Sequence, residues 1–127
     1  MNDMIKVLIC DDSALIRAKL KTLVELNGNS LILFAENGEQ GVQQYKEHRP
    51  DVVFMDIVMP VKTGIEALKE IREFDPSAKV VMASSAGTQA NLLEALKYGA
   101  YDFVQKPVAA EMIAGVLSKV LKERELV

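Results

Sequence analysis

The sequence predicts an α/β domain built on an open parallel sheet of five strands with helices on both faces. Three observations predict this class. Short apolar runs alternate along the chain with longer segments in which apolar residues recur at helical spacing. These runs are nearly continuous, as expected of strands in a sheet that is covered on both faces. The intervals between them are too long for hairpins and suit right-handed crossovers through helices.

The first third of the chain supplies two strands and a helix. Residues 5–10 form an apolar run with a single lysine and are expected to be a buried strand. Residues 13–27 carry apolar side chains on one helical face, and Gly28 is the expected stop. Residues 30–36 are expected to be the second strand, because the run is apolar and Asn37-Gly38 ends it.

The middle of the chain continues the alternation. Residues 39–48 are expected to form a short helix that ends near Pro50. Residues 51–56 are apolar up to a final aspartate and are expected to be the third strand. Residues 64–74 have isoleucine and leucine at helical spacing, and Asp75-Pro76 ends this helix.

The last third repeats the pattern twice. Residues 79–84 are expected to be the fourth strand, and residues 88–98 a leucine-bearing helix that stops at Gly99. Residues 101–105 are expected to be a shorter fifth strand. Residues 109–125 carry a broad apolar face and are expected to be the final helix.

Composition limits the class of protein. The 127 residues suit one domain with a single core, and no linker-like stretch divides residues 1–127. A net charge of −3 gives no general reason to bind nucleic acid or an anionic membrane. No apolar run approaches the about 18 residues of a membrane span, and the N-terminus lacks a signal-peptide pattern. The single cysteine, Cys10, excludes an internal disulfide, so cytoplasm is the expected location.

Polar side chains gather at the carboxyl ends of the predicted strands, the edge where open α/β sheets bind ligands. They are Asp11 and Asp12 after the first strand, Asp56 at the third, Ser84 and Ser85 at the fourth, and Lys106 after the fifth. Each alone suits a turn, a helix cap or a solvated surface. Together, three carboxylates repel one another unless a cation joins them, and Mg²⁺, or Mn²⁺ in its place, prefers such oxygen ligands. A carboxylate beside a metal can also be a nucleophile toward phosphorus.

Six short strings occur in an order and spacing that resemble the receiver domains of two-component response regulators. They are Val7-Leu8-Ile9-Cys10-Asp11-Asp12-Ser13, Met55-Asp56-Ile57-Val58-Met59-Pro60, Gly64, Ala83-Ser84-Ser85-Ala86, Gly99-Ala100 and Lys106-Pro107. The resemblance spans essentially the whole chain. It implies the flavodoxin-like, CheY-like form of the predicted fold and a stand-alone regulator of the chemotaxis type.

The resemblance also implies roles for individual residues. Asp56 would accept a phosphoryl group from a histidine kinase. Asp11, Asp12 and Asp56, with the backbone carbonyl of Val58, would hold Mg²⁺, Asp12 and Asp56 being the closer ligands and Asp11 acting directly or through water. Lys106 would pair with Asp56 and later with a phosphoryl oxygen.

Two further positions match the switch of this family. Ser84 corresponds to the switch hydroxyl, with Ser85 as the alternative if the register differs by one residue, and Phe103 corresponds to the switch aromatic. Phosphorylation would add acceptor oxygens at Asp56, Ser84 would move to donate to one of them, and Phe103 would rotate into the space beneath the fourth helix.

Three departures from common family usage lie in or near the site. Cys10 stands where an aliphatic residue or alanine is usual, and we expect a small buried apolar side chain there rather than a reactive thiol. Thr63 stands where Asp or Asn is frequent, which leaves the geometry of that loop open. Val58 and Ala86 flank the expected path of the hydrolytic water, and neither can orient it. We therefore expect slow hydrolysis of the phosphorylated form.

The expected partners follow from the resemblance. The phosphodonor would be a sensor histidine kinase or a phosphotransfer domain. The helix predicted for residues 13–27 has a second apolar face, formed by Leu15, Ala18, Thr22 and Leu26. This face is either the docking patch for the phosphodonor or partly buried under a neighbouring loop. An output protein would bind the surface of residues 88–125, around Ala90, Tyr98, Tyr101 and Gln105. A monomer and a phosphorylation-dependent dimer are both open.

The leading interpretation is a signalling switch that catalyses its own phosphorylation and dephosphorylation and is not a metabolic enzyme. Three alternatives compete with it. A phosphatase with an aspartyl-phosphate intermediate would need a substrate pocket and a second acid, and a pseudo-receiver or flavodoxin-like binding domain would not need the complete set of acids and lysine. A receiver excised from a larger regulator, such as a chemotaxis methylesterase, also fits the sequence.

Overall fold

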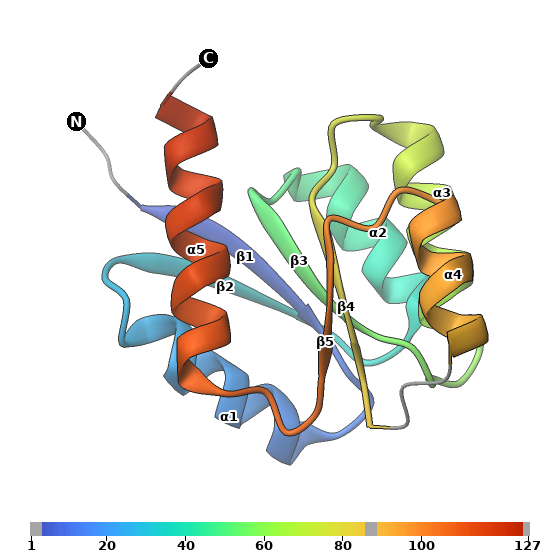
Figure 1. The fold of residues 1–127 in the computed structure, drawn as a ribbon, viewed down its shortest axis with the longest axis horizontal. Helices are drawn as coiled ribbons and strands as arrows, with labels where there is room; N and C mark the ends of the chain where they lie inside the picture. Colours follow the sequence, from blue (N-terminus) through green and yellow to red (C-terminus); the bar gives the residue numbers. More distant parts are fainter. Residues whose placement is uncertain (1–3, 86–88, 126–127) are drawn as a thin grey trace.

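The computed structural model describes residues 4–85 and 89–125 of the chain. In these residues, five parallel strands form one sheet in the order β2-β1-β3-β4-β5 (Figure 1). The strands are β1 (Ile5–Cys10), β2 (Ser30–Ala35), β3 (Val52–Asp56), β4 (Val80–Ser84) and β5 (Asp102–Gln105). The helices are α1 (Ala14–Glu25), α2 (Gly38–His48), α3 (Gly64–Phe74), α4 (Gln89–Lys97) and α5 (Ala110–Glu125). The predicted fold class is confirmed.

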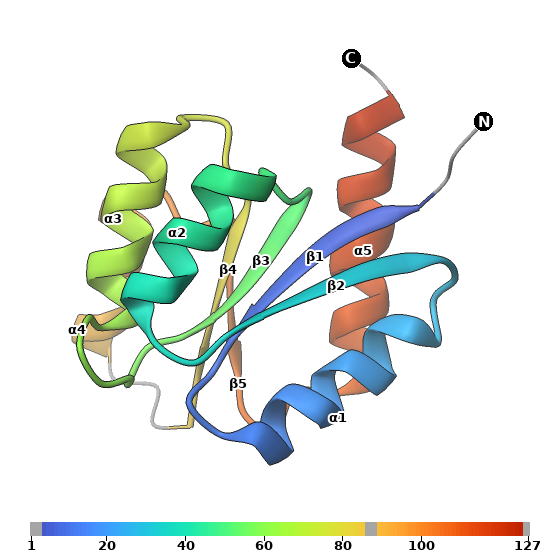
Figure 2. The same ribbon diagram turned by 180° about the vertical axis from the view of Figure 1, so that it is seen from behind.

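Helices cover both faces of the sheet, as the continuous apolar strands predict. Helices α1 and α5 lie on one face, and α2, α3 and α4 lie on the other (Figures 1 and 2). One core forms around Leu20 of α1 and Leu117 of α5, and the second around Val42 of α2 and Leu68 of α3. Successive residues of a strand therefore alternate between two buried cores rather than between core and solvent.

The ten predicted elements are present in the described residues, with ends that differ by at most two residues. The largest difference is at the helix predicted for residues 13–27, which runs only from Ala14 to Glu25. Ser13 lies outside it as the N-cap, where its hydroxyl accepts a hydrogen bond from Ile16 N at 3.3 Å. The first residue of the helix predicted for 88–98 lies outside the described residues.

Strand order brings the site together. Strands β1 and β3 are neighbours, with Cys10 opposite Met55 in their register. The residues that follow, Asp11 and Asp56, therefore emerge side by side at the carboxyl edge of the sheet. From β1 the chain adds β2 on one side of the sheet and then crosses over to add β3 on the other side. Open α/β sheets bind their ligands at the point of such a reversal.

The described helices are not suited to crossing a bilayer. None of those within residues 4–85 and 89–125 has both the length and the apolar character that a membrane span requires.

Candidate functional site

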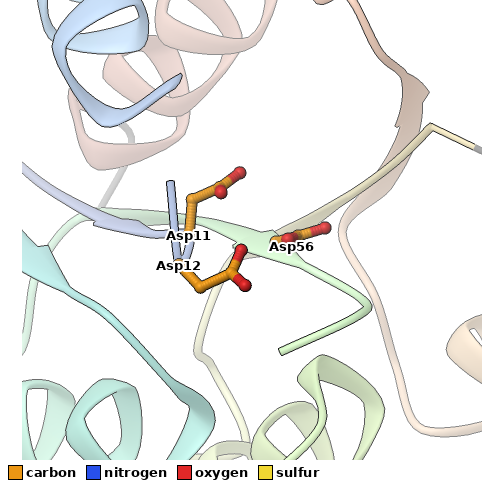
Figure 3. Close-up of side chains that lie close together, drawn as sticks. All are labelled: Asp11, Asp12 and Asp56. Carbon is orange, nitrogen blue, oxygen red and sulfur yellow. The ribbon is translucent and has the colours of Figure 1, made fainter. Parts of the chain in front are cut away.

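Three aspartates lie together at the carboxyl edge of the sheet (Figure 3). Asp11 and Asp12 follow β1 directly, and Asp56 is the last residue of β3. One carboxylate oxygen from each lies within 4.8 Å of the other two. Asp11 and Asp56 are buried whereas Asp12 is exposed, so the cluster is accessible from the Asp12 side.

Asp11 is held firmly by its neighbours. Its backbone N–H donates to Ala35 O at 3.0 Å, and its carboxylate accepts a hydrogen bond from Ser13 N at 2.9 Å. The guanidinium of Arg17 donates to the Asp11 carbonyl at 2.6 Å. These contacts leave the carboxylate little freedom and direct its second oxygen toward β5.

Lys106 supplies a cation to this cluster from the end of β5. Its ammonium lies 2.5 Å from Asp11 Oδ2 and 3.2 Å from Asp56 Oδ1. The sequence predicts a pairing with Asp56, and in the structure the ammonium contacts both acids and lies closer to Asp11. Burial by itself lowers the pKa of Lys106, but its hydrogen bonds and ion pairs with Asp11 and Asp56 outweigh burial and hold the pKa above its ordinary value.

The environment of Asp56 disfavours its ionised form. Burial raises the pKa of the Asp56 carboxyl, and the neighbouring charges of Asp11 and Asp12 raise it further. Lys106 lowers it, but not enough to cancel burial, so the pKa stays above its ordinary value. One ammonium therefore does not balance this group of acids.

The donor set fits a hard divalent cation. Three carboxylates converge within 4.8 Å, one of them is exposed, and within the described part of the chain only the Lys106 ammonium pairs with them. An all-oxygen site with access to solvent suits Mg²⁺, which retains several water ligands when it binds to proteins. Asp11, Asp12 and Asp56 are the side chains that would hold it, and the Val58 carbonyl remains a predicted ligand.

The loop between β3 and α3 is anchored on both sides. Lys62 forms an ion pair with Glu39 of α2 at 2.9 Å and another with Glu70 of α3. Its carbonyl accepts a hydrogen bond from Gly38 N at 3.0 Å. Sequence reasoning missed these contacts, because Lys62 lies in a loop and has no helical spacing to either acid. The anchors fix the loop that follows Asp56.

Thr63 resolves the question that the sequence left open for this loop. It is the N-cap of α3: its hydroxyl accepts from Glu66 N at 3.2 Å, and Glu66 Oε1 accepts from Thr63 N at 3.0 Å. This capping box was readable from the Thr-x-x-Glu spacing. The following Gly64 is required by close packing, because a Cβ there would overlap the backbone carbonyl of Asp56. Thr63 thus preserves a well-defined loop.

Two valines on the same loop are exposed. Val58 is 75% exposed and Val61 is 82% exposed. Val61 also has a φ of 69°, in the left-handed region that β-branched residues rarely adopt. Ala86, which is expected to flank the path of the hydrolytic water together with Val58, lies outside the described residues.

Ser84 and Phe103 lie on the same face of the sheet. Ser84 is buried at the end of β4, and Ser85 beyond it is exposed. Phe103 of β5 is opposite Met82, two residues before Ser84, and packs against the core under α2, α3 and α4. Because strand residues alternate in direction, Ser84 shares the face of Met82 and Phe103. This arrangement suits Ser84 rather than Ser85 as the hydroxyl coupled to Phe103.

The second apolar face of α1 is exposed. Leu15 is 76% exposed and Leu26 is 73% exposed, and Ala18 and Thr22 between them are exposed as well. Burial under a neighbouring loop, one of the two interpretations of this face, is therefore wrong. Next to it, Ile16, Leu20 and Leu23 line a small apolar pocket that also includes Lys106, Pro107 and Val108.

The expected output surface is mixed in exposure. Ala90 and Gln105 are exposed, whereas Tyr98 and Tyr101 are half-buried. Tyr101 donates a hydrogen bond from its hydroxyl to Glu123 at 2.8 Å, which ties β5 to α5. Tyr98 packs instead against the core beneath α3 and α4. The two tyrosines therefore belong to different sides of this surface.

Comparison with known proteins agrees with this geometry. Residues 7–123 match the family described as the response regulator receiver domain. The chain is 43% identical over 116 residues to the chemotaxis protein CheY of Bacillus subtilis, an alignment that covers 91% of this chain and 97% of CheY. It is 42% identical over 106 residues to a protein-glutamate methylesterase/protein-glutamine glutaminase of Bacillus licheniformis, covering 82% of this chain and 30% of that protein.

Solved structures share the fold. The CheX-CheY-BeF3-Mg²⁺ complex from Borrelia burgdorferi contains a chain that superposes with a TM-score of 0.83 at 36% identity. The superposition covers 94% of this chain and 89% of that one.

Proposed function

This chain belongs to the family of response regulator receiver domains, and from that premise we propose that it accepts a phosphoryl group on Asp56 with the help of Mg²⁺. Receiver domains are signalling switches rather than classical enzymes, and they bind Mg²⁺ at an acidic pocket. The phosphoryl group would come from a sensor histidine kinase or a phosphotransfer domain. The proposed outcome is a change in the surface that binds an output protein.

One observation carries this proposal: the buried Asp56 carboxylate lies 3.2 Å from Lys106 and beside Asp11 and Asp12. A lone buried aspartate would stay protonated or pair with one cation. Here it has an ammonium on one side and two carboxylates on the other, and the three acids together fit a divalent cation. Burial disfavours the charge of Asp56, but the ammonium and a bound cation together would keep it ionised for attack on phosphorus.

The chain's own residues account for the transfer step. An Asp56 carboxylate oxygen forms the new bond to phosphorus, while the bond from phosphorus to the donor histidine nitrogen breaks and its electron pair returns to that nitrogen. Mg²⁺, when bound, supplies positive charge against the carboxylates and the phosphoryl oxygens. Lys106 moves its ammonium from Asp56 to a phosphoryl oxygen and keeps its contact with Asp11.

The switch would follow from the new acceptor oxygens. Ser84 donates its hydroxyl to a phosphoryl oxygen, and its movement changes the packing on the face that it shares with Phe103. Phe103 is half-buried against the core under α4, so it can adopt an inward or an outward position. The surface of residues 88–125 thereby exists in two forms, only one of which binds the output partner.

Several finer points complete the proposal. The exposed face of α1 around Leu15 docks the phosphodonor, because it is apolar and lies near the carboxyl edge of the sheet.

We place the protein in the cytoplasm, where its phosphodonor would be. The choice between a stand-alone chemotaxis-type regulator and the receiver of a larger protein, such as a methylesterase, is decided by the length of the reading frame. An aspartyl-phosphate phosphatase is disfavoured because the family that the chain matches consists of signalling switches rather than classical enzymes.

Fluoroberyllate, a mimic of the phosphoryl group, tests the proposal without a kinase. We expect Mg²⁺ and fluoroberyllate together to shift the amide NMR signals of Asp56, Ser84 and Phe103. Neither component alone should move Phe103, and Asp56→Asn should abolish the response. Unchanged Asp56 and Phe103 signals in a folded protein would contradict the proposal.

A further inference from the structure

A cleft of about 340 Å³ lies between the last turns of α3 and α4, two helices that lie side by side (Figure 1). Six residues line it: Lys69, Arg72, Glu73, Lys97, Tyr98 and Gly99. Three of the six are cationic, although the whole chain carries a net charge of −3. The cleft is formed by the C-terminal ends of its helices and does not include Asp56 or the other acids of the candidate site.

The two lysines of the cleft converge on one aromatic ring. Lys69 Nζ lies 5.5 Å from the centroid of the Tyr98 ring, and Lys97 Nζ lies 5.6 Å from it. Among the described carboxylates, none lies within 4.0 Å of either ammonium. Lys62, by comparison, contacts two glutamates. The ring thus brings two positive charges together, and no described acid neutralises them. A bound anion would relieve the repulsion between the two ammonium groups.

Arg72 adds a fixed cation at the base of the cleft. One of its guanidinium nitrogens donates to the carbonyls of Pro76 and Ala78. Its Nε would lie 2.6 Å from a Cβ at position 99, so only the glycine at that position lets the guanidinium pack this closely. Arg72 therefore keeps its charge in place while Lys69 and Lys97 can move.

The helix ends do not cancel this charge. Each helix C-terminus contributes about half a negative charge, which explains a cation in the last turn of each helix. Arg72 and Lys97 occupy those turns, but Lys69 lies a turn earlier in α3. Against Glu73 and two helix ends, the three cations leave an excess of about one positive charge.

We propose that this cleft binds an acidic segment of a partner protein that carries Asp or Glu next to an apolar residue. The apolar contact would be Leu93, which is 59% exposed and lies one turn before Lys97 on the same face of α4. An extended chain of carboxylates fits an open cleft with cations on two helices. A compact phosphate is a poorer match, because such sites use converging backbone N–H groups or bidentate arginine, and the Arg72 guanidinium is already engaged with carbonyls.

Lys97, Tyr98 and Gly99 of the cleft belong to the proposed output surface, but the charges of the cleft need no phosphoryl group, so we expect binding here in both forms of the protein and can test it without Asp56. The probe is a fluorescein-labelled peptide rich in Glu and Asp with interspersed Leu, and binding is measured by anisotropy on the wild-type chain and on Asp56→Asn. The control peptide has Gln and Asn in place of the acids. Binding of the acidic peptide to both proteins, without binding of the control, would support the cleft whether or not Asp56 accepts a phosphoryl group.

The chain offers a matched control for the lysines. Lys119 Nζ lies 4.6 Å from the centroid of the Tyr101 ring, so it forms the same kind of pair on α5. We expect the double variant Lys69→Gln/Lys97→Gln to weaken peptide binding about fivefold or more, and Lys119→Gln to change it less than about twofold. Binding should also weaken several-fold with added salt, because the charges are exposed.

Four results would overturn the proposal. Three of them are no binding of the acidic peptide, equal loss in the Lys119→Gln control, and amide shifts that map away from residues 69–73 and 97–99. Inorganic phosphate, ATP and single-stranded DNA serve as competitors. If one of them binds more strongly than the acidic peptide, the ligand of the cleft is a phosphate group, and the proposal is also overturned.

Discussion

The Lys106 ammonium lies 2.5 Å from Asp11 Oδ2, a contact between residues 95 positions apart in the sequence. The same nitrogen lies 3.2 Å from Asp56. Asp11 therefore anchors the lysine, while Asp56 is its weaker partner. On phosphorylation Lys106 can exchange Asp56 for a phosphoryl oxygen without losing its anchor, which explains how one ammonium can serve both states.

Replacement of Asp56 by asparagine is expected to stabilise the protein in the absence of Mg²⁺. Burial and two neighbouring acids raise the pKa of Asp56, so its ionised form is disfavoured in the folded state. This penalty is present above the folded pKa and is relieved as pH falls through it toward the unfolded value. The gain in the free energy of unfolding should be large at pH 7 and shrink toward pH 4, as measured by urea unfolding.

Mg²⁺ provides the control for that experiment. It should stabilise the wild type at pH 7 and have less effect on Asp56→Asn, which has lost one carboxylate of the cluster. Equal stabilisation of both proteins by Mg²⁺ would mean that the ion binds elsewhere.

Val58→Asn is expected to speed the loss of the phosphoryl group from Asp56. Val58 is exposed on the loop that follows Asp56, and its side chain cannot orient a water molecule, whereas an amide can. The decay of the phosphorylated form after removal of the donor measures the rate. A variant that decays no faster than the wild type would contradict the role of this position.

Val61→Asn is expected to stabilise the fold by about 1 kcal/mol, since asparagine tolerates the left-handed backbone that valine adopts here at a φ of 69°. Val58→Asn is a matched control, because it makes the same change on the same exposed loop, and Val58 is not among the positive-φ residues. Thermal or urea unfolding measures the change in stability of each variant relative to the wild type. Equal shifts in the two variants would show that backbone conformation at residue 61 does not matter.

Leu15→Asp is expected to slow phosphoryl transfer from a histidine kinase and to spare transfer from acetyl phosphate. Leu15 is largely exposed on α1, so the change should not unfold the chain, but it puts charge into the proposed docking face. Leu31→Asp on β2, an exposed position outside the proposed docking surfaces, is the control for a general effect of added charge. Equal loss with both phosphodonors would rule out a docking role for Leu15.

The sequence predicts most of this fold because each element has a local cause. Strand runs and helical faces are visible in the apolar pattern, and Ser13 and the Thr63–Glu66 box mark helix starts. Strand order is different: the alternation of strands and helices does not say that β1 lies between β2 and β3. That order is set by which faces pack together across the whole domain.

The same distinction applies to the site. Any parallel sheet brings its strand ends to one edge, so the gathering of Asp11, Asp12 and Asp56 follows from the sequence. The preference of Lys106 for Asp11 over Asp56 does not, because it depends on side-chain directions and on the contacts that hold Asp11. The basic cleft between α3 and α4 was missed for a similar reason, since its residues come from two helices that β4 separates in the chain.

Intact mass after incubation with acetyl phosphate and Mg²⁺ tests the central claim most directly. We predict the addition of one phosphoryl group to the wild-type chain, none to Asp56→Asn, and none to the wild type when the metal is removed by a chelator. An unmodified wild type in a folded, Mg²⁺-containing sample, or an adduct that persists in Asp56→Asn, would contradict the assignment of Asp56 as the phosphoacceptor.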